Sequence, residues 1–270
     1  MAEELLSIEH LSASYGEKDV LTDISLSVKT GQIICIVGES GSGKSTLLKA
    51  VHGMDRVRVT GGSIRAFGSP VSAMTDEQRR SLLGGEIGLI PQNPAGSFNP
   101  IRPFEAQLRE TMQSHGRQFD PAETARAFEA VGLADARALL RLRPYELSGG
   151  MNQRVAIAAA MLLKPRLLLC DEVTSALDVT TAGKVIRELE QMNRELGTAI
   201  LMVTHHLGIA RRMAEKIGIM KDGRMIELED ADWILNAPVQ EYTRQLLRDV
   251  PKLAGRERSG EESAGGLDDR

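Results

Sequence analysis

The segment Gly38-Glu39-Ser40-Gly41-Ser42-Gly43-Lys44-Ser45 matches the pattern Gly-x-x-x-x-Gly-Lys-[Ser/Thr] at every fixed position. An apolar run at residues 32–37 comes directly before it and predicts a buried strand, and residues 45–51 predict a helix. Strand, glycine-rich loop and helix in this order are typical of nucleotide-binding proteins. We therefore expect an α/β fold built around this loop.

The glycines of the loop indicate the kind of ligand that it binds. They let backbone amides turn toward phosphate oxygens, and the following helix presents its positive end to the same anion. We expect Lys44 to contact the β and γ phosphates of a bound nucleotide, the Ser45 hydroxyl to bind Mg²⁺, and Thr46 to belong to the same site. The alternative is a glycine-rich turn without a ligand, which would not need Lys and Ser at these positions.

A second apolar run, residues 167–170, predicts another buried strand and ends in Asp171 and Glu172. A nucleotide site of this kind needs a further carboxylate for the metal. We expect Asp171 to hold Mg²⁺ through water and Glu172 to act as the general base for the attacking water. Two exposed carboxylates without a role are the alternative, and the phosphate loop upstream makes it the weaker one.

Composition narrows the class of protein. The 270 residues are 42% hydrophobic and 26% charged, which is typical of soluble globular proteins and excludes a disordered or disulfide-stapled chain. A net charge of -4 gives no general attraction to nucleic acid, and 3% aromatic residues disfavour a base-stacking surface. Cys35 and Cys170 lie in apolar runs without a Cys-x-x-Cys motif, so we interpret them as core residues in a reducing compartment.

No apolar run approaches the length of a membrane span, and the acidic N-terminus does not resemble a signal peptide. We expect a cytoplasmic protein that contacts the membrane only through a partner. Further short strands are predicted at residues 5–8, 24–28, 64–67, 87–90, 199–203 and 217–220, and a helix at 76–83.

The pattern becomes helical at residues 103–142, which we interpret as a helical insertion. Its apolar positions include Phe128, Val131, Leu133, Leu139 and Leu140. Residues 178–197 predict one long helix. Its single buried stripe comprises Ala182, Val185, Ile186, Leu189, Met192 and Leu196. From residue 252 onward the chain is rich in charge and glycine, which favours disorder.

The segment Leu147-Ser148-Gly149-Gly150-Met151-Asn152-Gln153-Arg154 lies ahead of the acidic pair, and here the sequence resembles the ATPase subunits of ABC transporters. In that family this signature caps the γ phosphate held by a second subunit, in a head-to-tail dimer. Amides of Ser148, Gly149 and Gly150 at a helix N-terminus would suit an anion. An ordinary helix cap would be the better interpretation of the tetrapeptide alone.

The resemblance assigns further residues. It implies that Tyr15 stacks on adenine, that Gln92 senses Mg²⁺ and the membrane subunit, and that His205 binds the γ phosphate beside Glu172. The implied catalytic set is thus Glu172, His205 and Gln92, and the implied metal set is Ser45, Gln92 and Asp171. Two residues depart from the family pattern: Val173 stands where proline is usual and His206 where aspartate is usual. The pair His205-His206 could instead bind a transition metal, although successive side chains are expected to diverge.

The resemblance also implies the architecture: a P-loop ABC ATPase with a RecA-like parallel sheet, an N-terminal antiparallel β subdomain and a helical subdomain. Residues 1–250 would form a single domain. Residues 1–92 and 160–250 would make the core with the β subdomain, and residues 93–159 the helical subdomain. Residues 251–270 would form a disordered tail.

Residues 91–100, 151–154, 236–238 and 242–247 resemble importers of the peptide and nickel group. Because no cysteine follows Cys170, as it commonly does in peptide-specific members, we expect a nickel or metal-chelate importer, with peptides left open. An exporter, or a non-transport ABC ATPase that acts on nucleic acid, is the alternative. The short helical region between Lys44 and Leu147 leaves no room for the coiled coil of the latter class.

The implied partners are a second ATPase, two membrane permeases and an extracytoplasmic solute-binding protein, with no nucleic acid. The second ATPase would be a non-identical paralogue, although a homodimer is possible. The chain would then lie at the cytoplasmic face of the membrane as a peripheral subunit.

Overall fold

A six-stranded sheet forms the centre of the computed structural model, which describes residues 2–53 and 56–248. Its strand order is β10-β9-β3-β8-β7-β6. The strands are β3 (Ile33–Val37), β6 (Ile87–Ile90), β7 (Leu167–Asp171), β8 (Ala199–Thr204), β9 (Lys216–Lys221) and β10 (Arg224–Asp230). All pairs are parallel except β9 with β10. The parallel, phosphate-loop α/β core expected from the sequence is therefore confirmed.

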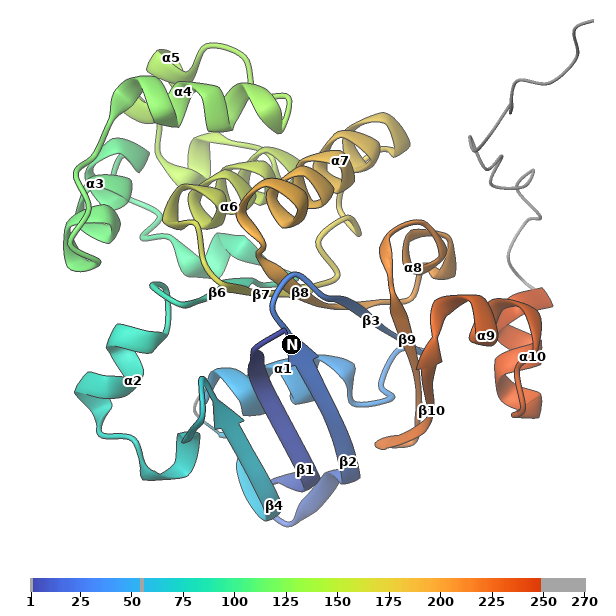
Figure 1. The fold of residues 1–270 in the computed structure, drawn as a ribbon. Coiled ribbons are helices and arrows are strands. Elements are labelled where there is room, and N and C mark those ends of the chain that lie inside the picture. Colours follow the sequence, from blue (N-terminus) through green and yellow to red (C-terminus); the bar gives the residue numbers. More distant parts are fainter. Residues whose placement is uncertain (1, 54–55, 249–270) are drawn as a thin grey trace, which may run out of the picture.

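Continuous apolar runs form the middle strands because both faces of this sheet are covered. Along β3, Ile33, Cys35 and Val37 belong to one core, while Ile34 and Ile36 belong to a second core on the other face. Figure 1 shows helices α3 to α7 on one side of the sheet and the N-terminal strands with α1 on the other. Cys35 and Cys170 are both buried free thiols, as expected for core residues.

A second, antiparallel sheet has the order β2-β1-β4-β5. Its strands are β1 (Glu4–Tyr15), β2 (Lys18–Lys29), β4 (Arg58–Ala66) and β5 (Ser69–Pro70). The predicted strands at 5–8 and 24–28 are too short, because most of the polar segment between them continues the pairing of β1 with β2. Register shifts around Leu11 interrupt the alternation of buried and exposed residues and hide this continuity in the sequence.

Helices follow the sequence prediction for residues 103–142, where three separate helices are found. The helical elements of this region are η2 (Pro94–Ser97), α3 (Phe104–Ser114), α4 (Pro121–Ala130), α5 (Ala136–Arg141), η3 (Pro144–Glu146) and α6 (Gly149–Leu163). The apolar positions noted in this region, Phe128, Val131, Leu133, Leu139 and Leu140, are buried. They belong to the same hydrophobic core as Ile33, Cys35 and Val37 of β3.

The other helices connect strands of the central sheet or lie at its edge. They are α1 (Lys44–His52), η1 (Val71–Ala73), α2 (Asp76–Leu82), α7 (Val179–Leu196), α8 (Leu207–Met213), α9 (Ala231–Asn236) and α10 (Glu241–Arg248). In α7, Val185, Ile186, Leu189 and Met192 are buried as expected. Leu196 is 51% exposed, so its assignment to the stripe was wrong. The helix ends there at the left-handed Gly197, and the chain turns into the buried strand β8.

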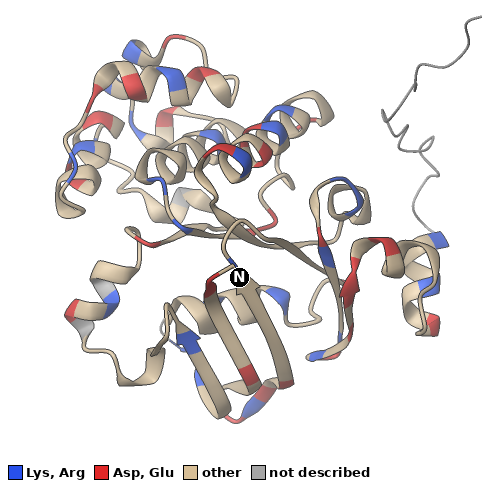
Figure 2. Cartoon of the chain, viewed as in Figure 1, with Lys and Arg blue, Asp and Glu red and all other residues tan. Residues whose placement is uncertain are grey.

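Lys and Arg are interspersed with Asp and Glu over helices and strands (Figure 2). Several opposite charges pair at the surface, including Arg102 with Glu110 and Arg212 with Glu190. Such exposed pairs contribute little stability. Within residues 2–53 and 56–248, no helix combines the length and hydropathy needed to cross a bilayer. The charged tail expected to be disordered lies outside the described residues.

Candidate functional site

The phosphate loop joins β3 to α1 in a conformation that requires its glycines. Gly41 and Gly43 have φ values of 84° and 100°, in the left-handed region that favours glycine. A Cβ atom at Gly38 would lie 2.2 Å from the carbonyl oxygen of Met220, at the end of β9. The fixed glycines of the pattern thus serve both the loop conformation and its close approach to the sheet.

Lys44 is buried and folds back over this loop. Its Nζ donates to the carbonyl oxygens of Gly38 at 2.8 Å and of Glu39 at 2.7 Å. Burial lowers the pKa of Lys44, while the nearby charges of Glu172 and Asp171 raise it. The ammonium group is therefore held at the loop by its own backbone, next to two carboxylates.

Ser45, in the first turn of α1, and Asp171, at the end of β7, are in direct contact. The Ser45 hydroxyl donates to Oδ1 of Asp171 across 2.7 Å. Burial raises the pKa of the Asp171 carboxyl, whereas the hydrogen bond from Ser45 and the charges of Lys49 and Lys44 lower it. A hydroxyl beside a carboxylate is an all-oxygen donor set, which suits Mg²⁺.

Glu172 stands at the meeting point of three neighbouring parallel strands, β6, β7 and β8. Its Oε2 accepts a hydrogen bond from the Gln92 amide at 3.0 Å, and its Oε1 lies 3.3 Å from Nδ1 of His205. The carboxyl ends of parallel strands share one edge of the sheet, so residues that follow them converge there. Glu172 itself has a φ of 48°, an uncommon value for a side-chain-bearing residue and one often found at functional sites.

A cavity of about 270 Å³ lies between these groups and the loop. Its lining residues are Val20, Ser40, Gly41, Gly43, Lys44, Ser45, Thr46, Gln92 and Glu172. The structure thus brings the loop together with Gln92 and Glu172, while their roles remain predictions. Val20, on β2, was missed, since one β-branched residue in a strand carries no signal of a ligand.

Tyr15 ends β1, opposite Lys18 on β2, and is half-buried. Unlike Val20 on β2, Tyr15 is not among the residues that line the cavity. A role of Tyr15 in stacking on adenine remains a prediction.

Ser148, Gly149 and Gly150 form the N-terminus of α6. The Ser148 hydroxyl caps the helix by accepting from the backbone N–H of Met151 at 3.3 Å. A Cβ atom at Gly150 would lie 3.2 Å from the carbonyl oxygen of Ala176, so this turn packs closely on the segment after β7. None of these three residues lines the cavity at the phosphate loop.

The rings of His205 and His206 lie 4.2 Å apart between centroids and are tilted by 40°. The expectation that their side chains diverge was therefore wrong. It assumed the alternation of a strand, but β8 ends at Thr204 and both residues belong to the turn before α8. Among the described residues, no group of three or more His, Cys, Asp or Glu could hold a metal ion, which leaves the transition-metal interpretation without support.

Comparison with known proteins adds to this geometry. The family described as "ABC transporter" matches residues 21–175. The dipeptide transport ATP-binding protein DppD of Escherichia coli (strain K12) is 36% identical over 259 residues, covering 93% of this chain and 79% of DppD. The oligopeptide transport ATP-binding protein OppD of the same organism is 35% identical over 260 residues, covering 93% of this chain and 77% of OppD.

Among solved structures, a dimeric ATP-binding cassette in a post-hydrolysis state, bound to ADP and Pi, has a TM-score of 0.76 at 27% identity. The match covers 84% of this chain and 99% of that one.

Proposed function

This chain belongs to the ABC transporter family as one of its ATP-binding, ATP-hydrolysing proteins, and we propose that it drives an importer whose cargo is a peptide. The observation that carries the cargo class is the similarity to DppD and OppD over 93% of the chain. The names of these relatives refer to dipeptide and oligopeptide transport. Nickel or metal-chelate uptake, expected from the lack of a cysteine after Cys170, is the second candidate and finds no support in those names.

In the proposed mechanism, the phosphates of ATP lie in the loop cavity against Lys44 and the amides of residues 41–46. Ser45 and Asp171 would hold Mg²⁺ together with Gln92, and the ion would neutralise charge on the phosphates. Glu172 takes a proton from the water that attacks the γ phosphate. His205 and Gln92, the two partners of its carboxylate, hold Glu172 in place for this step.

Two such chains would close head to tail, each signature capping the γ phosphate on the partner's loop. The position of Ser148, Gly149 and Gly150 outside the chain's own cavity supports this arrangement. We propose a non-identical paralogue as the partner. A homodimer is chemically possible, because this chain carries both the loop and the signature.

We further propose that two permeases and an extracytoplasmic solute-binding protein complete the importer. The chain would then be peripheral, on the cytoplasmic face of the membrane. Ile101 is 72% exposed and Tyr145 64% exposed, and Arg143 links their segments by donating to the carbonyl oxygen of Ile101 at 3.2 Å. These large exposed residues of the helical region are suited to bind a short helix of a permease. Gln92 lies on the segment that leads into this region. It would couple rotation of the helical region to the nucleotide site.

Uptake in cells that lack the gene tests the proposal. The parent chain should restore uptake of a labelled dipeptide, and Glu172→Gln should not. Glu195→Gln, the same chemical change on the exposed face of α7, is the matched control and should restore uptake fully. Restored uptake of labelled Ni²⁺ without any effect on peptide uptake would assign the chain to the nickel class and overturn the peptide proposal.

A further inference from the structure

The C-terminal helix α10 is in contact with the phosphate loop. The backbone N–H of Glu39 donates to the Tyr242 hydroxyl at 3.2 Å, between residues 203 apart in the sequence. The ammonium nitrogen of Lys221 also lies over the Tyr242 ring, 4.7 Å from the ring centroid. A single side chain therefore reaches from the end of the described chain to the second residue of the loop.

This hydrogen bond acts on the peptide unit that also holds Lys44. The N–H of Glu39 and the carbonyl of Gly38 belong to one planar amide, and that carbonyl accepts from Lys44 Nζ at 2.8 Å. Because the amide is rigid, a partner that fixes the direction of its N–H also fixes the direction of its carbonyl. Tyr242 thereby orients the acceptor that holds the Lys44 ammonium.

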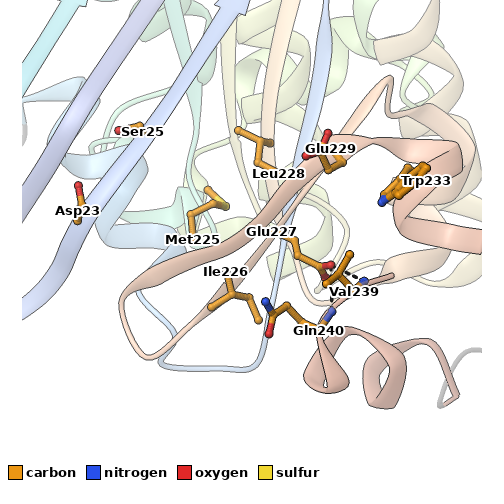
Figure 3. A pocket seen from close by; sticks show the side chains of 10 residues that line it. All are labelled: Asp23, Ser25, Met225, Ile226, Glu227, Leu228, Glu229, Trp233, Val239 and Gln240. Atoms are coloured by element: carbon orange, nitrogen blue, oxygen red, sulfur yellow. Dashed lines mark hydrogen bonds between the residues drawn. The ribbon is translucent and has the colours of Figure 1, made fainter. Parts of the chain in front are cut away.

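The helix that carries Tyr242 is itself anchored. Glu227, on β10, accepts hydrogen bonds from the backbone N–H groups of Val239 at 2.7 Å and Gln240 at 3.1 Å, just before α10, as Figure 3 shows. Its second carboxylate oxygen accepts from the buried Thr243 hydroxyl. A carboxylate in this position ties the start of the helix to the central sheet, and its negative charge is favourable near a helix N-terminus.

We propose that Tyr242 is a positioning residue for ATP binding, which sets the phosphate loop and Lys44 through the amide between Gly38 and Glu39. The inference rests on ATP binding at this loop, and it is independent of the cargo that the importer carries. It also makes α10 part of the nucleotide site, since a displacement of the helix would release that amide.

Tyr242→Phe tests the proposal, because it keeps the ring over which Lys221 lies and removes only the hydroxyl. We expect a Kd for a fluorescent ATP analogue that is about 3- to 10-fold higher, the effect of one hydrogen bond. Gln245→Ala, an exposed change in the same helix, is the control and should leave the Kd unchanged.

Hydrogen exchange separates positioning from a merely structural role. In Tyr242→Phe the amide of Glu39 should exchange faster, while the amides of α10 and the unfolding midpoint stay at parent values. Faster exchange throughout α10 would indicate that the hydroxyl only holds the helix, and an unchanged Kd would show that it does not act on the loop; either result overturns the inference. ATP hydrolysis by the parent chain and its loss in Glu172→Gln, measured alongside, test the loop assignment separately.

Discussion

The amide of Gln92 donates to the carboxylate of Glu172 across 3.0 Å and links the segments that follow β6 and β7. His205 lies 3.3 Å from the other carboxylate oxygen, so both oxygens have a partner. The Glu172 side chain is 14% exposed and lines the cavity at the phosphate loop. This geometry is suited to the general base proposed above, because it holds a carboxylate at the cavity that would receive the phosphates.

Glu172→Gln should bind ATP with parent affinity but hydrolyse it at least ~100-fold more slowly, because the water loses its base. The loop and its contacts with Lys44 and Ser45 remain intact in this variant. It should also accumulate a closed dimer, visible by size-exclusion chromatography with ATP. Phosphate release measures turnover, with Glu195→Gln as the control, and near-normal turnover would remove Glu172 from the role of general base.

Lys44→Ala should weaken ATP binding itself, since a charged hydrogen-bond donor to the phosphates is lost. A contribution of about 1.5–3 kcal/mol for such a group corresponds to roughly 10- to 150-fold in affinity. Titration with a fluorescent nucleotide measures the change. Lys184→Ala, on the exposed side of α7, should bind as the parent does. Equal affinities in all three proteins would contradict the loop assignment.

Ser148→Arg should leave ATP binding to the isolated chain almost unchanged, because Ser148 does not line that chain's own cavity. Dimer closure should fail, since the arginine would occupy the place of the partner's γ phosphate. Gln113→Arg, an exposed change on α3, serves as the control. In a mixed complex of mutant and intact chains, the impaired site should be the one on the intact chain's loop. Loss of affinity in the isolated mutant would rule out the head-to-tail arrangement.

Gly38→Ala should lower stability by about 1–3 kcal/mol, the usual cost of overpacking. The added carbon would meet a backbone oxygen, that of Met220, which cannot move without shifting β9. Gly208→Ala, in α8 with no atom within 4 Å of the new carbon, should be neutral or more stable by up to about 1 kcal/mol. Denaturant unfolding compares the two variants. A Gly38→Ala protein as stable as the parent would show that the loop can move away from β9.

Contiguous patterns predicted the parts of this protein whose causes are local. The loop at residues 38–45, the strands β3, β7 and β8 and the helix α7 follow from short-range sequence, because glycine conformations, apolar runs and helical periodicity act over a few neighbouring residues. Edge elements were less predictable. Strand β10, half-buried, and the short helices α8 and α9 carry no clear period of their own, since packing against one side of the sheet stabilises them.

The sequence by itself determined which residues carry charge, carboxylate or hydroxyl oxygens and a glycine-rich loop, and that several of them end buried strands. Only the tertiary structure decided which of them meet. Glu172 contacts Gln92 because β6 and β7 are neighbours in the sheet, and Tyr242 contacts Glu39 because α10 folds back over the end of β9. The order of the strands and the docking of the helices depend on which apolar faces, from segments far apart in the sequence, pack against one another. That packing free energy is shared over the whole core, so no single segment of the sequence records it.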